Sequence, residues 1–344
     1  MTGYRILFKF PVIVENNFMN TTSKRSSLLD EMRSQLRREG YAYSTENSYC
    51  DWVKRFVKFH AFESRASMLV DSAQKVEQFL TDLAVVQNVA PSTQNQALNA
   101  LVYCYSKVLK APFSDVKASR CRKEPRIPVV LTKEEVGQVL SFMDGTTGLI
   151  AKLLYAGGLR ITEAVRLRVQ DIDFGFKQIT VRDGKGKKDR VTPLANNLIL
   201  ALEAQLQKVK TLHQQDLELG YGSVYLPYAL AKKYPNADKA LAWQYVFPSR
   251  NLAEDPRSGV TRRHHVDQSL VNKAIKQAVN KCGITKKVSA HTFRHSFATH
   301  LLQTGTDIRT IQSLLGHANL QTTMIYTHVL KQGGQGVVSP FDVL

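Results

Sequence analysis

A basic segment with two prolines, residues 117–128, divides the chain into two parts. Pro125 and Pro128 cannot continue a helix, because proline lacks the backbone N–H and its ring clashes with the preceding turn. The chain has 344 residues, so the part on either side is long enough to bury a core. We therefore expect a disordered extension over residues 1–25, a helical domain over 26–116, a linker over 117–128 and a second domain over 129–344.

The first part has the apolar spacing of helices. Between residues 26 and 116 apolar side chains recur every three or four positions, and no strand pattern stands out. One stripe contains Trp52, Val53 and Phe56, which we interpret as core rather than as a binding surface. Lysines on the opposite faces, Lys54 among them, suit backbone phosphates, although most single surface cations are only solvated.

The second part combines helices with a short sheet. Thr132 and Glu135 have the spacing of a capping box, which predicts the start of a helix. Residues 178–182 and 190–194 are short β-like runs separated by a glycine-rich turn, which predicts an antiparallel hairpin. The expected fold class is therefore mainly α with a small antiparallel sheet.

The composition indicates a polyanionic partner. The chain carries 47 Lys and Arg against 29 Asp and Glu, a formal net charge of +18. Nucleic acid is the first candidate for a charge of this size. An anionic membrane surface is the alternative, but no long basic amphipathic helix and no spanning segment stand out, so we expect no membrane partner.

A cluster of side chains near the C-terminus is suited to phosphate chemistry. If residues 292–303 form a helix, His291, Arg294 and His295 lie on one side near its N-terminus, where the macrodipole and the free amides favour an anion. Lone histidines are more often ordinary core or surface residues. The phosphate-site interpretation is favoured here because other suitable groups occur in the same chain.

One of those groups lies downstream of a predicted helix break. Gly316 is expected to end the next helix. An unbroken helix would hold His317 and Tyr326 about 13 Å apart along its axis. The break allows the chain to fold back, so that both side chains reach one phosphate.

Two further cations lie far upstream. Arg160 begins a predicted helix that also carries Glu163, and a helix N-terminus favours an anion. Lys185 stands between two glycines in the hairpin turn, where the main chain is able to approach DNA closely. This turn lacks the spacing of a nucleotide-binding P-loop.

Neither the histidines nor the cysteines form a metal-binding pattern. The histidines lack an HExxH motif and have no carboxylate or thiolate at ligand spacing, so we predict neither a metal nor another cofactor. The four cysteines are widely spaced and form no CxxC pair. This usage is typical of a reducing compartment, and we expect the protein in the cytoplasm.

Residues 221–265, within an expected insertion over about 212–265, form a segment rich in both aromatic and basic side chains. Aromatic faces beside cations suit unstacked bases, and each such stack contributes about 1–3 kcal/mol. A minor hydrophobic core beneath a long insertion explains the composition equally well. The composition alone does not decide between them.

Taken together, the candidate site residues resemble the active-site set of the tyrosine recombinases. The matching positions are Arg160 with Glu163, Lys185 in a turn, His291-x-x-Arg294, Gly316-His317 and Tyr326. The resemblance covers nearly everything from about residue 26 to residue 344. It implies a helical, SAM-like DNA-binding domain followed by a mainly α catalytic domain, with DNA as the partner.

The resemblance also implies a mechanism. Tyr326 attacks the scissile phosphate and forms a 3′-phosphotyrosine intermediate, which retains the energy of the broken bond, so neither ATP nor metal is required. It implies that Arg160, Arg294 and His317 bind the phosphate. It also implies that Lys185 protonates the 5′ oxygen and that His291 accepts the tyrosine proton. Glu163 and His295 are expected to support these groups.

Within that family, the insertion and the C-terminal end are similar to those of integron integrases. The matching stretches are Leu226-Pro-x-Ala-Leu, Lys233-Tyr-Pro-Asn-Ala, Trp243-x-x-Val-Phe-Pro, Arg262-Arg-His-His265 and Thr323-Met-Ile-Tyr-Thr-His-Val. This likeness implies a homotetramer that integrates and excises gene cassettes at two attachment sites, including folded single-strand hairpins with extrahelical bases. The residues expected to contact DNA are Lys187, Lys188, Arg262 and Arg263, with Pro256, His264 and His265 near those bases.

Two other functions remain open. A phage-type or Xer-like recombinase would act on duplex sites, and a preference for duplex or hairpin substrate separates it from an integron integrase. A catalytically silent DNA-binding protein on the same scaffold would form no covalent adduct with DNA. The complete residue set favours an active enzyme.

Overall fold

The computed structural model describes residues 27–112, 128–182, 189–226, 228–332 and 341 of the chain. It separates into two compact units, residues 1–125 and 126–344. The predicted features that lie outside the described residues are the extension over 1–25, nearly all of the linker over 117–128, and the turn with Lys185, Lys187 and Lys188.

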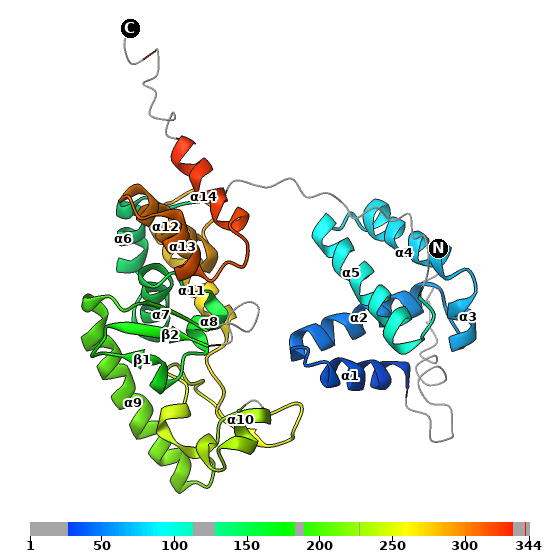
Figure 1. Cartoon of the computed structure of the whole chain (residues 1–344), viewed down its shortest axis with the longest axis horizontal. Helices are drawn as coiled ribbons and strands as arrows, with labels where there is room; N and C mark the ends of the chain where they lie inside the picture. The colour runs from blue at the N-terminus through cyan, green and yellow to red at the C-terminus, as the bar shows by residue number, and fades with distance from the viewer. Residues whose placement is uncertain (1–26, 113–127, 183–188, 227, 333–340, 342–344) are drawn as a thin grey trace, which may run out of the picture. The chain divides into compact units, whose positions relative to one another are not determined.

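The N-terminal unit is helical, as the sequence predicted (Figure 1). Trp52, Val53 and Phe56 are buried in its core, which confirms their interpretation. The short helix α3 was not predicted, because five residues are too few to show a helical period. Its α-helices are α1 (Leu28–Arg38), α2 (Tyr43–Phe59), α3 (Arg65–Leu69), α4 (Ser72–Thr81) and α5 (Pro91–Tyr103). Two short π-helices, η1 (Asp82–Val86) and η2 (Cys104–Val108), continue α4 and α5.

The second unit begins with the predicted capping box. Oγ1 of Thr132 accepts from the N–H of Glu135, and the Glu135 carboxylate accepts from the N–H of Thr132 at 2.8 Å. Among the described residues, the α-helices of this unit are α6 (Lys133–Ser141), α7 (Gly145–Ala156), α8 (Ile161–Val165), α9 (Ile199–Glu218), α10 (Tyr228–Lys233), α11 (Gln268–Lys281), α12 (Ala290–Gln303), α13 (Ile308–Leu315) and α14 (Gln321–Gln332). Short 3₁₀ turns are η3 (Val169–Asp171), η4 (Asn196–Leu198), η5 (Ala237–Lys239) and η6 (Leu241–Trp243).

The described residues of this unit also form two small antiparallel sheets. The predicted hairpin is present, with Val181 opposite Arg190 and Ile179 opposite Thr192. A second hairpin lies within the insertion. The strands are β1 (Ile172–Asp173), β2 (Gln178–Val181) and β3 (Arg190–Pro193) in one sheet, and β4 (Ala253–Glu254) and β5 (Thr261–Arg262) in the other. The predicted fold class, mainly α with small antiparallel sheets, is therefore confirmed.

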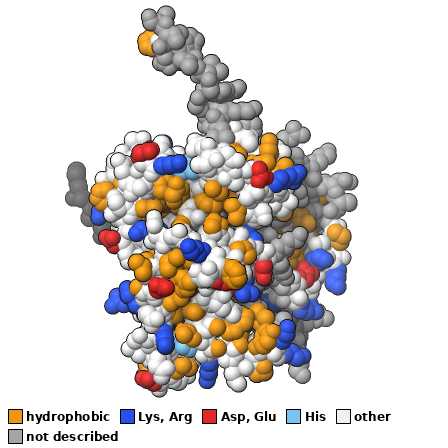
Figure 2. Space-filling view, turned by 60° about the vertical axis from the view of Figure 1, so that its left-hand side comes forward, with side chains coloured by type: hydrophobic (Ala, Val, Ile, Leu, Met, Phe, Trp, Pro, Cys, Tyr) orange, Lys and Arg blue, Asp and Glu red, His pale blue; other side chains and the backbone are white. Residues whose placement is uncertain are grey.

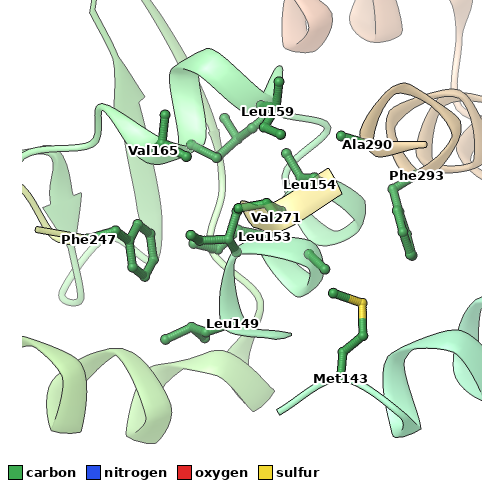
Figure 3. Close-up of a cluster of buried hydrophobic side chains, with 14 of the residues drawn as sticks. Met143, Leu149, Leu153, Leu154, Leu159, Val165, Phe247, Val271, Ala290 and Phe293 are labelled. Atoms are coloured by element: carbon green, nitrogen blue, oxygen red, sulfur yellow. The ribbon is translucent and has the colours of Figure 1, made fainter. Parts of the chain in front are cut away.

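The core of the second unit surrounds α7. This helix is largely apolar, so several elements cover it, including α8, α11 and α12. Figure 3 shows Leu153 and Leu154 beside Val271 of α11, and Leu149 of α7 and Phe293 of α12 belong to the same buried cluster. Helix α12 also contacts α13 and α14, and these three lie at one end of the unit, away from α9 and α10 (Figure 1).

Gly158 allows α12 to approach the turn that precedes α8. Its φ is +60°, and a Cβ at this position would lie 2.4 Å from Cδ1 of Phe297, a residue of α12. Glycine is therefore required both by the left-handed backbone and by the close contact. This approach brings α12 beside the segment that leads into Arg160.

Gly158→Ala is expected to lower the free energy of unfolding by about 2 kcal/mol or more, because overpacking a core costs about 1–3 kcal/mol and the left-handed backbone adds to that cost. Gly220→Ala is the matched control, since Gly220 also has positive φ, +82°, but has no neighbour within 4 Å of an added Cβ. Thermal denaturation of both variants measures the difference. Equal losses of unfolding free energy in the two variants would contradict the close-contact explanation.

Basic side chains are scattered over the face of the molecule that Figure 2 shows. Figure 2 shows lysine and arginine side chains distributed across one face, among hydrophobic and acidic ones. On this face the basic side chains are not gathered in one segment. Among the helices that the structure describes, none is long and apolar enough to cross a membrane.

Candidate active site

Helix α12 supplies three side chains of the candidate site from its first two turns. Ser289 precedes the helix and forms a capping box with Thr292. His291, Arg294 and His295 follow at the spacing that places them on one side of a helix. The helix and its starting region agree with the sequence prediction.

Arg294 is the buried cation of the site, with 3% of its surface exposed. Its Nη1 donates to the carbonyl oxygen of Gly158 at 2.5 Å, and its Nη2 donates to that of Leu315 at 2.6 Å. Nη2 also lies 3.2 Å from Nε2 of His317, and a carboxylate oxygen of Glu163 is 3.8 Å from Nη1. Burial lowers the pKa of Arg294 to about 10, so the guanidinium stays charged at neutral pH. A buried cation held largely by carbonyl oxygens favours a bound anion.

A buried carboxylate, that of Glu163, holds two more arginines. Its Oε1 accepts from Nη1 of Arg160 at 2.6 Å and from Nη1 of Arg190 at 2.9 Å. Its Oε2 accepts from the backbone N–H of Arg160 at 2.7 Å and from Nη2 of Arg190 at 2.6 Å. Burial alone would raise the pKa of Glu163, but the hydrogen bonds from Arg190 and Arg160 lower it to about 2. The carboxylate is therefore ionised and fixes both guanidiniums.

Arg190 is a site residue that the sequence analysis did not identify. Its Nε donates to the carbonyl oxygen of Leu314 at 2.8 Å, so it joins β3 to the end of α13 as well as to Glu163. Strand alternation places Arg190 on the same face as Thr192, which is buried. Charged side chains are rarely buried unless they are paired. The position of Arg190 on the inner face of a strand was therefore the sequence signal that it pairs with a buried carboxylate.

Gly316 ends α13 and turns His317 toward the buried arginine. Gly316 has φ +62°, and a Cβ there would lie 2.9 Å from Cδ of Arg190. Nδ1 of His317 is 3.0 Å from Oγ1 of Thr323, and Nε2 faces Arg294. The helix break predicted from Gly316 is confirmed.

Tyr326 projects from α14 into the same cluster. Oδ1 of Asn319 accepts from the N–H of Gln321 at 2.9 Å, which confirms the predicted cap of this helix. Tyr326 is buried, and its ring stacks on that of His317 with the centroids 6.4 Å apart. Its Oη lies 3.0 Å from Nδ1 of His295. Burial raises the pKa of the Tyr326 hydroxyl, so it is protonated at neutral pH.

His291 and His295, one turn apart on α12, have different environments. Burial, together with His291 and Arg294, lowers the pKa of His295 to about 4. His291 is exposed, and its ring centroid is 6.1 Å from that of His295. The structure thus brings His295 into hydrogen-bond contact with Tyr326, whereas the resemblance had assigned the tyrosine proton to His291.

The arrangement as a whole suits attack on a phosphate. Arg160, Arg294 and His317 form one cluster with Tyr326, and Nη2 of Arg160 lies 3.5 Å from the carbonyl oxygen of Gly316. Cationic donors around a hydroxyl are able to bind an anion and stabilise charge as it develops. Within the described part of the chain, no group of three or more His, Cys, Asp or Glu side chains is arranged to hold a metal.

Two arginines that were predicted to contact DNA pair with carboxylates of the insertion. Nε and Nη2 of Arg263 donate to the two carboxylate oxygens of Asp216, and its Nη1 donates to the carbonyl oxygens of residues 249 and 250. Nη1 of Arg262 lies 3.6 Å from the carboxylate of Asp255. Both side chains therefore stabilise the fold of the insertion, and a role toward DNA remains a prediction.

The aromatic side chains of the insertion divide between core and surface. Tyr245 is buried with Val224 and Leu226 in a small hydrophobic cluster. Tyr221 and Tyr234 are exposed. The minor-core interpretation is therefore confirmed for Tyr245, and the exposed rings are accessible to a ligand.

The β4–β5 hairpin and the residues after it carry the other predicted base contacts. Pro256 is exposed in the hairpin turn. His264 is half-buried, and His265 packs edge-on against the ring of Tyr245 with the centroids 5.2 Å apart. These side chains come from one short segment, which makes them testable as a group.

Two family models match the chain. The Phage integrase family matches residues 129–333. The N-terminal SAM-like domain of phage integrases matches residues 28–115. The two matches fall on the two units of the structure.

Bacterial and archaeal proteins are similar over most of the chain. An Integrase/recombinase of Escherichia coli is 45% identical over 318 residues, which cover 92% of this chain and 94% of that protein. Tyrosine recombinase XerA of Pyrococcus horikoshii is 31% identical over 309 residues, which cover 88% of this chain and 90% of that protein.

Two solved structures share the fold. XerH site-specific recombinase bound to its difH substrate has a TM-score of 0.54 at 21% identity, covering 89% of this chain and 85% of that one. The Tn1549 transposon integrase in complex with transposon right end DNA has a TM-score of 0.58 at 16% identity, covering 92% and 96%. The chain therefore belongs to the phage integrase family, the tyrosine recombinases, which are enzymes that cut and rejoin DNA strands at specific sites.

Proposed function

We propose that this protein is an integron-type integrase that recombines gene cassettes at attachment sites through a 3′-phosphotyrosine intermediate. The observation that carries the chemistry is the environment of Tyr326, whose ring stacks on His317 within a cluster of arginines. Burial raises the pKa of its hydroxyl, while the charges of Arg294 and Arg160 act to lower it. The same cations would attract a DNA phosphate to the tyrosine oxygen.

In the proposed reaction the two arginines neutralise the phosphate as it becomes five-coordinate. Glu163 orients Arg160, and the carbonyl oxygens of Gly158 and Leu315 orient Arg294. Donors fixed in advance stabilise developing charge without reorganising during the reaction. His317 is proposed as a further donor, and no metal takes part in these steps.

Lys185 is proposed as the general acid that protonates the leaving 5′ oxygen. The sequence places it in the turn between β2 and β3, outside the described residues. The strands on either side are held in register by Val181 and Arg190, and Arg190 is anchored on Glu163. Removing an acid group of this kind typically slows a reaction by a factor of about 100 to 10,000.

The insertion supports a substrate with unpaired bases. It adds the β4–β5 hairpin, which exposes Pro256, and it places His264 shortly after β5. Exposed Tyr221 and Tyr234 in the same segment suit stacking on extruded bases. On this proposal the insertion reads the shape and the extrahelical bases of folded single-strand sites.

A duplex-specific recombinase of the Xer type is the second candidate. It is favoured by the 31% identity to XerA of Pyrococcus horikoshii over most of both chains. A catalytically silent DNA-binding protein is disfavoured, because Arg160, Arg294, His317 and Tyr326 form one cluster.

Covalent trapping on matched substrates separates these candidates. One attachment site is prepared as a duplex and as a folded single strand, and protein–DNA adducts that survive denaturing detergent are counted. An integron-type integrase is expected to form adducts on the folded strand at least as readily as on the duplex. Adducts on the duplex alone would support the Xer type, and their absence on both would contradict the catalytic proposal.

Replacing both His264 and His265 with alanine is expected to weaken binding to a hairpin with bulged bases by about 1–3 kcal/mol for each stack that is lost. Binding to the same hairpin without those bases is expected to stay unchanged, which makes it the control. His264→Ala alone separates base contact from the packing of His265 on Tyr245. Equal loss on the two hairpins would contradict the base-reading role.

We also propose that four copies assemble on two attachment sites in the cytoplasm. Exchange between two sites needs an active site for each strand that is cut, and closed symmetric assemblies supply such sets. Light scattering of the protein with two-site DNA measures the stoichiometry. A complex with fewer than four copies at saturation would contradict the proposal.

A further inference from the structure

The hydroxyl of the nucleophile has one hydrogen-bond partner among the described residues. Tyr326 has 1% of its surface exposed, so water does not solvate its hydroxyl. A buried phenol needs a protein acceptor for its proton. Nδ1 of His295, 3.0 Å from Oη, is that acceptor.

The ring of His295 is in the protonation state that this bond requires. Burial, His291 and Arg294 all lower its pKa, to about 4, so the imidazole is neutral at working pH. Nδ1 then carries the lone pair that accepts from Tyr326, and Nε2 carries the ring proton. Tyr326 has no other acceptor in the described part of the chain, which fixes the direction of the bond.

His291 is the alternative acceptor, because the family resemblance assigns the tyrosine proton to it. It lies one turn earlier on α12, with its ring centroid 6.1 Å from that of His295. His291 is exposed, whereas His295 contacts the reacting oxygen directly. The two histidines therefore have separable roles.

The geometry assigns to His295 the role of general base, which takes the proton of Tyr326 as the tyrosine oxygen attacks the DNA phosphate; this assignment rests on the proposed function. A bond forms between phosphorus and Oη, and the bond between phosphorus and the 5′ oxygen breaks. The proton of Oη moves to Nδ1 of His295, and the leaving 5′ oxygen takes a proton from the general acid of the proposed function. Religation runs the same transfers in reverse.

The bound phosphate compensates for the weak basicity of this imidazole. A negative charge beside His295 favours its cationic form, which the neighbouring Arg294 and His291 disfavour in the absence of DNA. The arginine charges also act to lower the pKa of the Tyr326 hydroxyl. The rise in the pKa of His295 on phosphate binding reduces the difference in proton affinity between His295 and Tyr326.

The same helix contains a matched control pair. Nδ1 of His300 lies 2.9 Å from Oη of Tyr155, and the two rings are 5.8 Å apart. His300 is buried on α12, five residues after His295. His300→Ala therefore removes a histidine–tyrosine hydrogen bond from the same helix without touching the nucleophile.

The test measures single-turnover cleavage by the full-length protein on a substrate in which sulfur replaces the 5′ oxygen. Sulfur leaves without protonation, so this substrate does not need a general acid and isolates the nucleophile side of the reaction. On it, His295→Ala and His295→Asn are expected to be about 100-fold or more slower than the unsubstituted protein. His300→Ala is expected to cleave at the unsubstituted rate, and added imidazole is expected to restore part of the activity of His295→Ala.

His295→Asn separates proton transfer from positioning. The asparagine oxygen is able to accept the tyrosine hydrogen bond but does not take its proton, and it keeps the assignment testable if His295→Ala fails to fold. His295→Asn at the unsubstituted rate, or His295→Ala no slower than His300→Ala, would overturn the assignment. If the unsubstituted protein forms no Tyr326-dependent adduct, the proposed function fails instead, so the two failures are distinct.

Discussion

Tyr326→Phe is expected to abolish the covalent protein–DNA adduct, because the oxygen that forms the bond to phosphorus is removed. The phenylalanine ring keeps the stack on His317, so the folded site is preserved apart from the hydrogen bond to His295. A typical intramolecular hydrogen bond contributes about 1 kcal/mol to stability. The fold and the affinity for DNA are therefore expected to survive while cleavage is lost.

Denaturing gels detect the adduct, and a binding titration measures the affinity of the variant. Tyr155→Phe is the control, since it also removes the hydroxyl of a half-buried tyrosine that is hydrogen-bonded to a histidine of α12. Tyr155→Phe is expected to form adducts at the unsubstituted rate. Adducts from Tyr326→Phe would show that another residue is the nucleophile.

Glu163→Ala is expected to have the second largest effect, because one carboxylate holds Arg160 and Arg190 and lies 3.8 Å from Arg294. Removing one partner of a buried ion pair typically costs about 3–5 kcal/mol. Displacing a phosphate-binding guanidinium by about 1 Å slows cleavage on the order of 100-fold. The variant is expected to lose both stability and rate.

The chain offers a matched control for this change. Asp171 accepts from the backbone N–H of Arg168, three residues before it, and from Nε of Arg182, which directly follows β2; this arrangement resembles that around Glu163. Asp171→Ala is expected to lower stability but to leave the cleavage rate unchanged at temperatures where the protein is folded. Chemical denaturation and single-turnover cleavage measure the two quantities. Equal losses of rate in both variants would contradict a specific role for Glu163.

The ion-pair cluster also predicts a dependence of stability on pH. The pKa of Glu163 is about 2 in the folded protein, below its ordinary value of 4.5. A lowered carboxyl pKa stabilises the fold fully above the ordinary value, and this contribution is lost as pH falls toward the folded value. The difference in unfolding free energy between the unsubstituted protein and Glu163→Gln is therefore expected to shrink between pH 5 and pH 2. A difference that stays constant over this interval would contradict the assignment.

Much of the site was predicted from local patterns in the sequence. The end of α13 at Gly316 and the cap of α14 by Asn319 are set by residues close in the chain, so the sequence is sufficient to predict them. The hairpin between β2 and β3 likewise follows from strand runs and their turn. The short helix α3 and the two-residue strands β4 and β5 are too brief to show a period.

The sequence did not indicate which groups the polar side chains bind. Arg263 was predicted to contact DNA, and its guanidinium is bound to Asp216, which lies far from it in the sequence. Arg190 had no predicted role, and it anchors Glu163 and the end of α13. Such pairs depend on how distant elements pack, so residue type alone indicated a charge but not its partner.

The sequence by itself determined the mainly α fold class, the helix breaks and the set of groups suited to phosphate chemistry, because periodicity, caps and turn residues act over a few positions. Tertiary structure alone decided which of these groups meet. Packing of α12 against α14 places His295, rather than His291, on the hydroxyl of Tyr326. The physical reason is that a hydrogen bond depends on a few tenths of an ångström between atoms from separate helices, a distance that no local pattern encodes.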